Sequence, residues 1–313
     1  MKAILFLTIT ALGAALFASC SNEEELTRGS YPNDNIIRVT AGVNNMTRGN
    51  EVTTALNKDF SLNVVNSTNG NYSYANEIFS LNGGTEWSST NKLLWENLAT
   101  PVEIVALYPA TDANTFSGVF SKESNSYGTI SYGVKPDQSI RDDANDLLLY
   151  HNANFVPKDN LEDGKLDIQF NHAFCRVDIE VTIGTEFNAT NGLAVNPIQG
   201  ISVEGTKTTA KIGFTPTAPF FTVTPSASGE VTSITPTLDD FTQAASATDQ
   251  AVAKYSCMVI PQTATLKVVL HTSDMEYEWT DTQKVLESGK QYTLQLNLKK
   301  SATTRNFILR ERK

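Results

Sequence analysis

Apolar residues occur in short runs along the chain, and within many runs they alternate with Thr, Ser, Asn or other polar residues. A period of two is typical of β-strands that bury one face and expose the other, and Gly, Pro, Asn and Asp between the runs mark turns. We expect strands over residues 36–43, 60–65, 102–107, 166–183, 201–203, 210–214, 266–270, 275–279 and 292–298. One short helix is expected over 238–248. The pattern therefore predicts an all-β protein.

The longest expected strand, residues 166–183, changes the face that it buries. Its apolar residues occupy even positions from Leu166 to Phe174 and odd positions from Cys175 to Ile183. A strand whose alternation changes phase must bulge or cross between sheets, here near residues 173–175. Such a strand can leave one β-domain and enter another. We therefore place a domain boundary near residue 165, between domains at 49–165 and 166–313.

The first twenty residues have the pattern of an export signal. Lys2 precedes an apolar stretch at 4–17, which is shorter than the roughly 20 residues that a spanning helix needs. The stretch ends in small residues followed by Cys20, and this order resembles a bacterial lipobox. The resemblance implies a signal peptide at 1–19 and lipidation of Cys20; the alternative is an ordinary signal peptide that contains a cysteine. The acidic run at 23–25 resembles a surface-export signal of Bacteroidetes lipoproteins, or serves as a solvated tether.

The first expected strand is followed by a polar loop that contains one basic residue. The strand covers 36–43, and Arg48 lies in the loop at 44–49. Accessible loops are the preferred sites of proteolysis. A trypsin-like cut between Arg48 and Gly49 would detach the lipid and the first strand together. The remaining β-domain would have an open edge, which templates a strand from another chain.

Composition narrows the function classes. The chain has 313 residues, which suggests two domains at roughly one per 150 residues. Its 34 Asp and Glu outnumber 24 Lys and Arg, so the net charge is −10, and such a surface disfavours nucleic acid as a partner. The hydrolase elbow, the phosphate-binding loop, the dinucleotide fingerprint and the zinc-peptidase motif are absent. We therefore expect no enzyme activity, no cofactor and no bound metal.

Side chains that carry chemistry are few. Three histidines lie far apart and lack ligand spacing: His151, His172 and His271. We expect hydrogen-bonded or exposed side chains for them rather than metal ligands. The acidic stretch 142–146 lacks the glycine and terminal glutamate of a calcium loop, so we favour a solvated turn. Cys175 and Cys257 lie in apolar contexts and form either a disulfide or two buried thiols.

Several aromatic residues allow two interpretations. They are Tyr72, Tyr74, Trp87 and Trp95. These residues could form a platform on which a carbohydrate stacks, or they could pack inside a domain. We favour the core, because isolated tryptophans in β-domains usually pack there.

Short motifs spread over nearly the whole mature chain follow one another in an order that we compare with a known family. They are the lipobox at Cys20, Thr47-Arg48 after the first strand, Leu94-Trp95, Ala106-Leu107-Tyr108-Pro109, Asp146-Leu147-Leu148, Phe170-Asn171-His172-Ala173-Phe174 and Ser288-Gly289-Lys290-Gln291-Tyr292-Thr293-Leu294. In this order they resemble the fimbrillin family of Bacteroidetes, the subunits of type V pili.

The resemblance implies two β-sandwich domains of transthyretin-like type in tandem, after a lipoprotein signal peptide. It implies a lipid-anchored, surface-exposed protein of the outer membrane, from which an arginine-specific protease removes the leader 20–48. The implied cut lies between Arg48 and Gly49; Arg28 is a rival site, but a cut there keeps the first strand. Other fimbrial subunits are the implied partners, joined by strand exchange. The candidate donor strand lies in the tail, at Phe307, Ile308 and Leu309.

Two functions remain on these grounds. We favour a structural subunit of a cell-surface fimbria that supports adhesion. The alternative is a monomeric surface lipoprotein that binds a host glycan or protein, or a pilus tip or anchor subunit. The binding lipoprotein rests on the tryptophans and on the acidic run at 23–25. The tip or anchor subunit rests on the short tail after Leu298, which offers few apolar residues to fill the alternating pockets of a groove.

Overall fold

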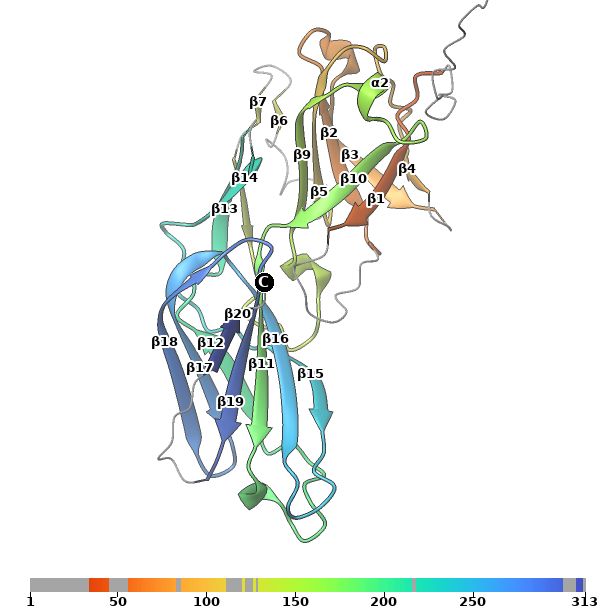
Figure 1. The fold of residues 1–313 in the computed structure, drawn as a ribbon. Coiled ribbons are helices and arrows are strands. Elements are labelled where there is room, and N and C mark those ends of the chain that lie inside the picture. The colour runs from red at the N-terminus through yellow and green to blue at the C-terminus, as the bar shows by residue number, and fades with distance from the viewer. Residues whose placement is uncertain are drawn as a thin grey trace, which may run out of the picture.

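The computed structural model describes residues 34–44, 56–82, 86–110, 120–121, 126–127, 129–215, 218–300 and 308–311. Almost all regular structure in this part of the chain is β-strand, arranged in two units that lie one above the other in Figure 1. The described helical segments are short: η1 (Gly70–Tyr72), η2 (Asp143–Asn145), α2 (Pro157–Asn160) and η3 (Thr185–Phe187). No described helix has the length and apolar character needed to cross a membrane. The expectation of an all-β protein is confirmed.

The first unit is a ring of hydrogen-bonded strands in the order β1-β10-β9-β5-β2-β3-β4. Its strands are β1 (Val39–Val43), β2 (Phe60–Val65), β3 (Tyr74–Leu81), β4 (Trp87–Ser89), β5 (Val102–Tyr108), β9 (Leu148–Phe155) and β10 (Leu166–His172). Within the described strands, β4 closes the ring onto β1 through one residue pair, Val39 opposite Trp87. Beyond β4 the closure continues through isolated contacts: the amide of Ile37 donates to the carbonyl oxygen of Leu93, and the amide of Trp95 donates to that of Asn35.

Aromatic side chains fill the barrel around Phe60. Phe60 is fully buried, and its ring centroid lies 5.3 Å from that of Phe79, 4.8 Å from that of Trp87 and 5.6 Å from that of Phe170. Aliphatic side chains of β2, β5 and β10 complete this core. We call the contact between β1 and β4 the seam. The rings of Phe60, Phe79, Trp87 and Phe170 form one aromatic cluster beneath it, which we call the aromatic floor.

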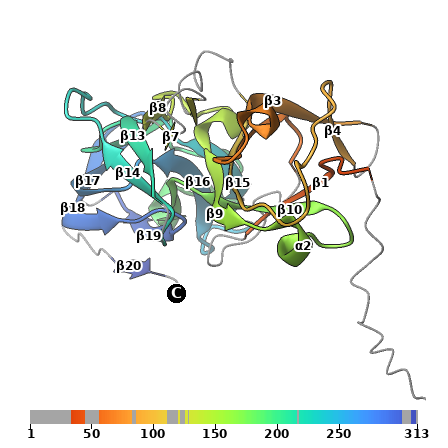
Figure 2. The ribbon, with the colours of Figure 1, turned by 90° about the horizontal axis from the view of Figure 1, so that it is seen from above.

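The second unit contains sheets that share another core. One sheet has the order β15-β16-β11-β19-β20, a second has β12-β17-β18, and a third has β14-β13-β8. Their strands are β8 (Thr129–Gly133), β11 (Cys175–Ile183), β12 (Gly200–Glu204), β13 (Thr209–Phe214), β14 (Phe221–Pro225), β15 (Thr237–Thr242), β16 (Ala251–Val259), β17 (Gln262–His271), β18 (Glu276–Leu286), β19 (Gln291–Leu298) and β20 (Ile308–Glu311). A small pair, β6 (Phe120–Ser121) and β7 (Ser126–Tyr127), lies apart from these sheets. Figure 2 shows the two units side by side from above.

The chain first visits the second unit between β5 and β9, where β8 pairs with β13, and it crosses there finally between β10 and β11. Phe170 belongs to the first core, whereas Ala173 and Phe174 belong to the second. The expected change of buried face near residues 173–175 is confirmed. The boundary expected near residue 165 falls one strand too early, because β10 pairs with β1 and β9 of the first unit.

The expected helix at 238–248 is wrong, because its first part forms the edge strand β15. Leu238 lies opposite Tyr255 of β16 and Phe241 lies opposite Ala253. Phe241 packs against the second core, while Asp239 lies on the exposed side of this edge. Charged residues on an edge strand are a usual protection against unwanted pairing.

Strand β5 joins the two units because both of its faces are buried. Ile104 and Ala106 point into the barrel core, whereas Val105 and Leu107 belong to the second core. A strand covered on both faces reads as a continuous apolar run rather than as an alternation. This explains the unbroken run at 104–107.

His151 on β9 adds a polar contact between the units. Its Nδ1 lies 2.8 Å from the carbonyl oxygen of Phe220, and its Nε2 lies 2.6 Å from Oε1 of Glu103. The imidazole is 1% exposed, and the rings of Phe214 and Phe220 meet it edge-on. The ring therefore joins a carboxylate of the first unit to a backbone carbonyl of the second.

We expect His151→Ala to lower the free energy of unfolding by about 2 kcal/mol, because it leaves a cavity and an unpaired Glu103. The matched control is His271→Ala. The imidazole of His271 is 51% exposed and its ion pair with Glu276 is long, at 3.4 Å, so its loss should cost under about 0.5 kcal/mol. Urea denaturation of both variants measures the difference. Equal, small effects would contradict a structural contact between the units.

Candidate functional site at the seam between β1 and β4

Strand β1 is held firmly on one side. It runs parallel to β10, in a register that places Val39 opposite Leu166 and Val43 opposite Phe170. Hydrogen bonds flank this ladder: the amide of Leu166 donates to the carbonyl oxygen of Arg38, and the amide of Asn44 donates to that of Phe170, both at 2.8 Å. The strand expected at 36–43 is therefore present, although the ladder to β10 begins three residues later than expected.

The other side of β1 is joined only at separate points. After the Val39–Trp87 pair, the next described contact is the amide of Ile37, which donates to the carbonyl oxygen of Leu93 at 3.0 Å. From Val39 to Ile37 the β1 side advances two residues, whereas from Trp87 to Leu93 the other side advances six. The segment 88–92 must therefore bow outward. The loop between these contacts leaves β1 without a continuous partner.

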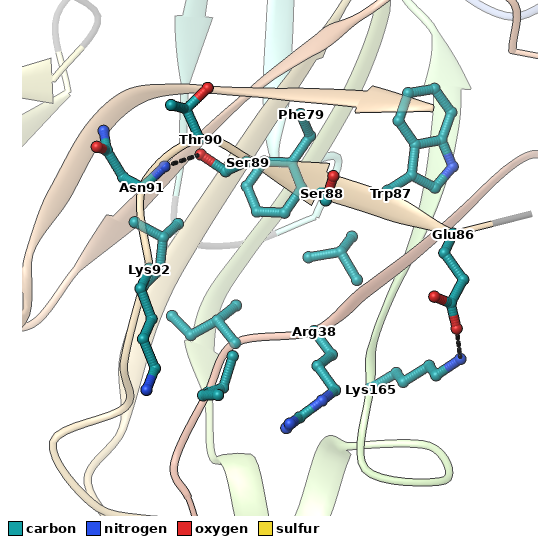
Figure 3. A pocket seen from close by; sticks show the side chains of 14 residues that line it. Arg38, Phe79, Glu86, Trp87, Ser88, Ser89, Thr90, Asn91, Lys92 and Lys165 are labelled. Carbon is teal, nitrogen blue, oxygen red and sulfur yellow. Dashed lines mark hydrogen bonds and ion pairs between the residues drawn. The ribbon is translucent and has the colours of Figure 1, made fainter. Parts of the chain in front are cut away.

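A cavity of about 370 Å³ lies where this segment bows away. Figure 3 shows the side chains that line it. Phe79 and Trp87 lie on its apolar side. Polar and charged side chains lie around its rim, among them Glu86 and Lys165, whose ion pair spans 3.8 Å. The cavity lies between β1 and the segment 88–92, which do not pair with each other. The described residues contain no group of His, Cys, Asp or Glu that could hold a metal ion.

The inward face of β1 and of the residues before it is apolar. Ile37 is 5% exposed and Val39 is 3% exposed, whereas Ala41 and Val43 are half-buried. Full burial of such an Ile or Val contributes about 1.5–3 kcal/mol. The site that holds this strand, which we call its seat, therefore has two deep positions, occupied by Ile37 and Val39. Two shallow positions follow, occupied by Ala41 and Val43.

The outward face of β1 is polar and matches β10. Thr40 Oγ1 donates to Oδ1 of Asp167 at 2.8 Å, and Asn44 Nδ2 donates to Oδ1 of Asn171 at 3.0 Å. The first contact is to a half-buried carboxylate and the second joins two exposed amide side chains, and both add specificity to the register. Each such hydrogen bond contributes about 1 kcal/mol.

The start of this segment is anchored by a bidentate ion pair. Arg38 donates to both carboxylate oxygens of Asp34, at 2.9 and 2.6 Å. The guanidinium of Arg38, together with the amide of Ile36, lowers the pKa of Asp34 to about 2.

Acid should weaken this anchor. Because the pKa of Asp34 is depressed from 3.8 to about 2, the pair contributes stability above pH 4 and loses it as the pH falls toward 2. A carbon NMR titration of the Asp34 carboxyl measures the midpoint. In the control Arg38→Gln the midpoint should rise toward the ordinary value. An ordinary midpoint in the unaltered protein would show that the pair does not form in solution.

The residues singled out for other chemistry have structural roles. His172 lies 2.8 Å from Asp146, and Asp142 forms ion pairs with Lys58 and Lys135. Asp142 also caps η2 by accepting from the amide of Ala144 at 2.9 Å. The acidic stretch 142–146 is thus a capped, ion-paired turn.

Cys175 and Cys257 are buried free thiols. They lie on neighbouring strands, Cys175 opposite Val259 and Cys257 opposite Val177. Burial raises the pKa of both thiols, so neither is an activated nucleophile. The sequence left open a disulfide or two buried thiols, and the structure shows two buried thiols.

The tryptophans do not form an exposed platform. Trp95 is 3% exposed and stacks on Phe155, with ring centroids 5.7 Å apart. Trp87 is 8% exposed and packs on Phe60. The hydroxyl of Tyr74 donates to the carbonyl oxygen of Leu94 at 3.0 Å. The core interpretation of both tryptophans is confirmed.

Several predicted site residues lie outside the described residues: Cys20, Arg28, Arg48, Gly49 and Phe307. Ile308 and Leu309 lie in β20, which pairs antiparallel with β19, Ile308 opposite Gln295 and Leu309 opposite Leu294. Sequence reasoning missed Asp167. The alternation of polar residues at 167, 169 and 171 could have identified it as part of an outward-facing row.

The fold resembles solved structures from Bacteroides. A candidate cell adhesion protein from Bacteroides ovatus superposes with a TM-score of 0.59 at 13% identity, covering 90% of this chain and 98% of that one. A candidate cell adhesion protein from Bacteroides uniformis gives 0.56 at 14% identity, covering 90% and 100%. A Bacteroides ovatus fimbrial protein gives 0.49 at 15% identity, covering 84% and 49%. No curated protein sequence matches the chain.

The sequence itself matches a family model described as fimbrillin-like, over residues 38–308. The match starts at β1 and extends to β20, so it includes both units and the seam. The resemblance that the order of motifs indicated is therefore confirmed at the level of the family. The chain belongs to the fimbrillin-like family.

Proposed function

We propose that this protein is a structural subunit of a surface fimbria that polymerises by strand exchange after proteolysis releases β1. The observation that carries the proposal is the seam. Strand β1 has a full ladder to β10 but a single pair to β4, and its inward side chains contribute to the aromatic core. Its loss leaves an apolar groove with a free strand edge, which another chain's strand can fill.

The position of the cut follows from this geometry. Arg48 comes after β1, so cleavage there breaks the covalent link between β1 and the barrel. Arg28 comes before β1, and cleavage there leaves the strand attached. Arg38 is protected, because its carbonyl accepts a hydrogen bond from the amide of Leu166. Arg48 is therefore our assignment for an arginine-specific protease, with Gly49 as the new N-terminus.

The proposal includes the leader and the anchor. Residues 1–19 are a signal peptide, and Cys20 carries the lipid that holds the unprocessed subunit at the outer membrane. Residues 20–48 leave together with β1. The two units are tandem β-sandwich modules of transthyretin-like type, and their partners are other fimbrial subunits.

The tail is our candidate donor. Strand β20 adds to the edge of β19 by backbone pairing, so this segment already adopts the conformation that a donor strand requires. Transfer to a neighbour replaces one edge pairing by another. The glycan-binding alternative loses its main support, since Trp87 and Trp95 are core residues.

Digestion of the purified full chain with an arginine-specific protease tests the proposal. We expect the new N-terminus at Gly49 to appear first, followed by oligomers that resist denaturing gels. The variant Arg28→Ala is the matched control and should behave like the unaltered protein. Mass spectrometry checks that the tail, which contains Arg305, Arg310 and Arg312, is still intact. A stable monomer after complete cleavage at Arg48 with an intact tail would rule out strand exchange by this route.

A further inference from the structure

The groove that β1 leaves has a distinct pattern of depth. Its two deep positions are those of Ile37 and Val39, and its shallow positions begin at Ala41. An incoming strand that runs in the direction of β1 needs two apolar residues, two positions apart. It can carry a polar residue at the next inward position.

Strand β10, at one side of the groove, carries an anion for which the described residues provide no cationic partner. Asp167 is half-buried on β10, and its described hydrogen-bond partners, Thr40 and Gln169, are both neutral. The nearest cation on the same row, Lys165, pairs with Glu86. When β1 leaves, Asp167 also loses the hydroxyl of Thr40. The position opposite Asp167 then favours a basic residue.

The tail of the chain has the matching order of residues. Phe307 and Leu309 are apolar and two positions apart, Arg310 follows, and Glu311 and Arg312 come next. In an extended strand, Phe307, Leu309 and Glu311 share one face, and Ile308, Arg310 and Arg312 share the other.

One register satisfies both patterns. Phe307 takes the place of Ile37, and Leu309 takes the place of Val39. The basic residue that follows then lies opposite Asp167, as Thr40 does in the described structure. The acidic residue after it falls at a shallow position, where it stays in contact with water.

We propose that Asp167 is the residue by which the groove selects its incoming strand, and that the strand is the tail of a second copy of this chain, with Arg310 opposite Asp167. This inference rests on the proposed function, and it names the partner and the register. The groove thus accepts the order apolar, any residue, apolar, basic. A short tail suffices, because the seat has only two deep positions.

The test compares two labelled peptides of residues 302–313, the natural one and one with Arg310→Glu, on protein cleaved at Arg48. The readout is the ratio in which the two peptides are captured, because competition from the released leader cancels in this ratio. We expect the unaltered groove to prefer the natural peptide about fivefold, the effect of a favourable exposed ion pair. Asp167→Asn should bring the ratio close to one, and Asp167→Lys should reverse it.

The matched control is Glu162→Lys, a charge reversal at an exposed position before β10, which should keep the natural preference. Thermal denaturation of each uncut variant confirms that it is folded. Equal capture of the two peptides by the unaltered groove would overturn the role of Asp167. No capture of the natural peptide, with oligomers still forming, would show that another strand fills the groove; it would overturn the inference but not the proposed function.

Discussion

Replacing Arg48 by alanine is expected to abolish polymer formation while the subunit still folds and reaches the surface. The uncut chain keeps β1 tethered beside its own seat. A tethered strand has an effective concentration on the order of millimolar, so a strand from another molecule cannot compete with it. Denaturing gels of surface extracts measure the result, and ladders of oligomers should disappear.

The control for this experiment is Arg28→Ala, which removes the rival site and should leave the ladders unchanged. Both variants should show equal amounts of surface protein by protease-accessibility assays. Normal ladders from Arg48→Ala would refute the assignment of the cut, and loss of ladders from Arg28→Ala alone would transfer it to Arg28.

Phe60→Ala should lower the free energy of unfolding by about 3–5 kcal/mol, as expected for truncation of a fully buried phenylalanine. Phe60 is 0% exposed and contacts three aromatic rings beneath the seam. The surrounding strands are joined into a ring, so they cannot easily collapse into the cavity. Urea denaturation followed by tryptophan fluorescence measures the change in the barrel, where Trp87 reports on the site.

The matched control is Ile78→Ala on β3, whose side chain is 38% exposed; its loss should cost under about 1 kcal/mol. If Phe60→Ala costs no more than this control, the aromatic floor does not hold the barrel together. The same variant should also release β1 faster after cleavage at Arg48, because the floor on which β1 packs is lost.

Much of the fold follows from local alternation. Period-two patterns identify β1, β10, β11 and β19, since each buries one face. The phase change before Cys175 correctly predicts the crossing between units. The segment at 238–248 was misleading, because Leu238 and Phe241 are spaced as on a helix, and pairing with β16 overrides that local preference.

The seam itself could not be read from the sequence. Its geometry depends on Trp87 meeting Val39 and on Leu93 meeting Ile37, and such long-range pairings leave no local pattern. The tryptophans illustrate the same limit, because only the fold shows that Trp87 packs against the strand whose release we propose. The sequence does show the first strand, the basic residue Arg48 in the loop after it, and a short apolar stretch in the tail.

The most direct test of strand release is the N-terminal sequence of the subunit isolated from assembled fimbriae. We predict a chain that begins at Gly49 and therefore lacks β1. A subunit in the polymer that begins at Cys20 or at Gly29 would retain β1 and contradict the proposal.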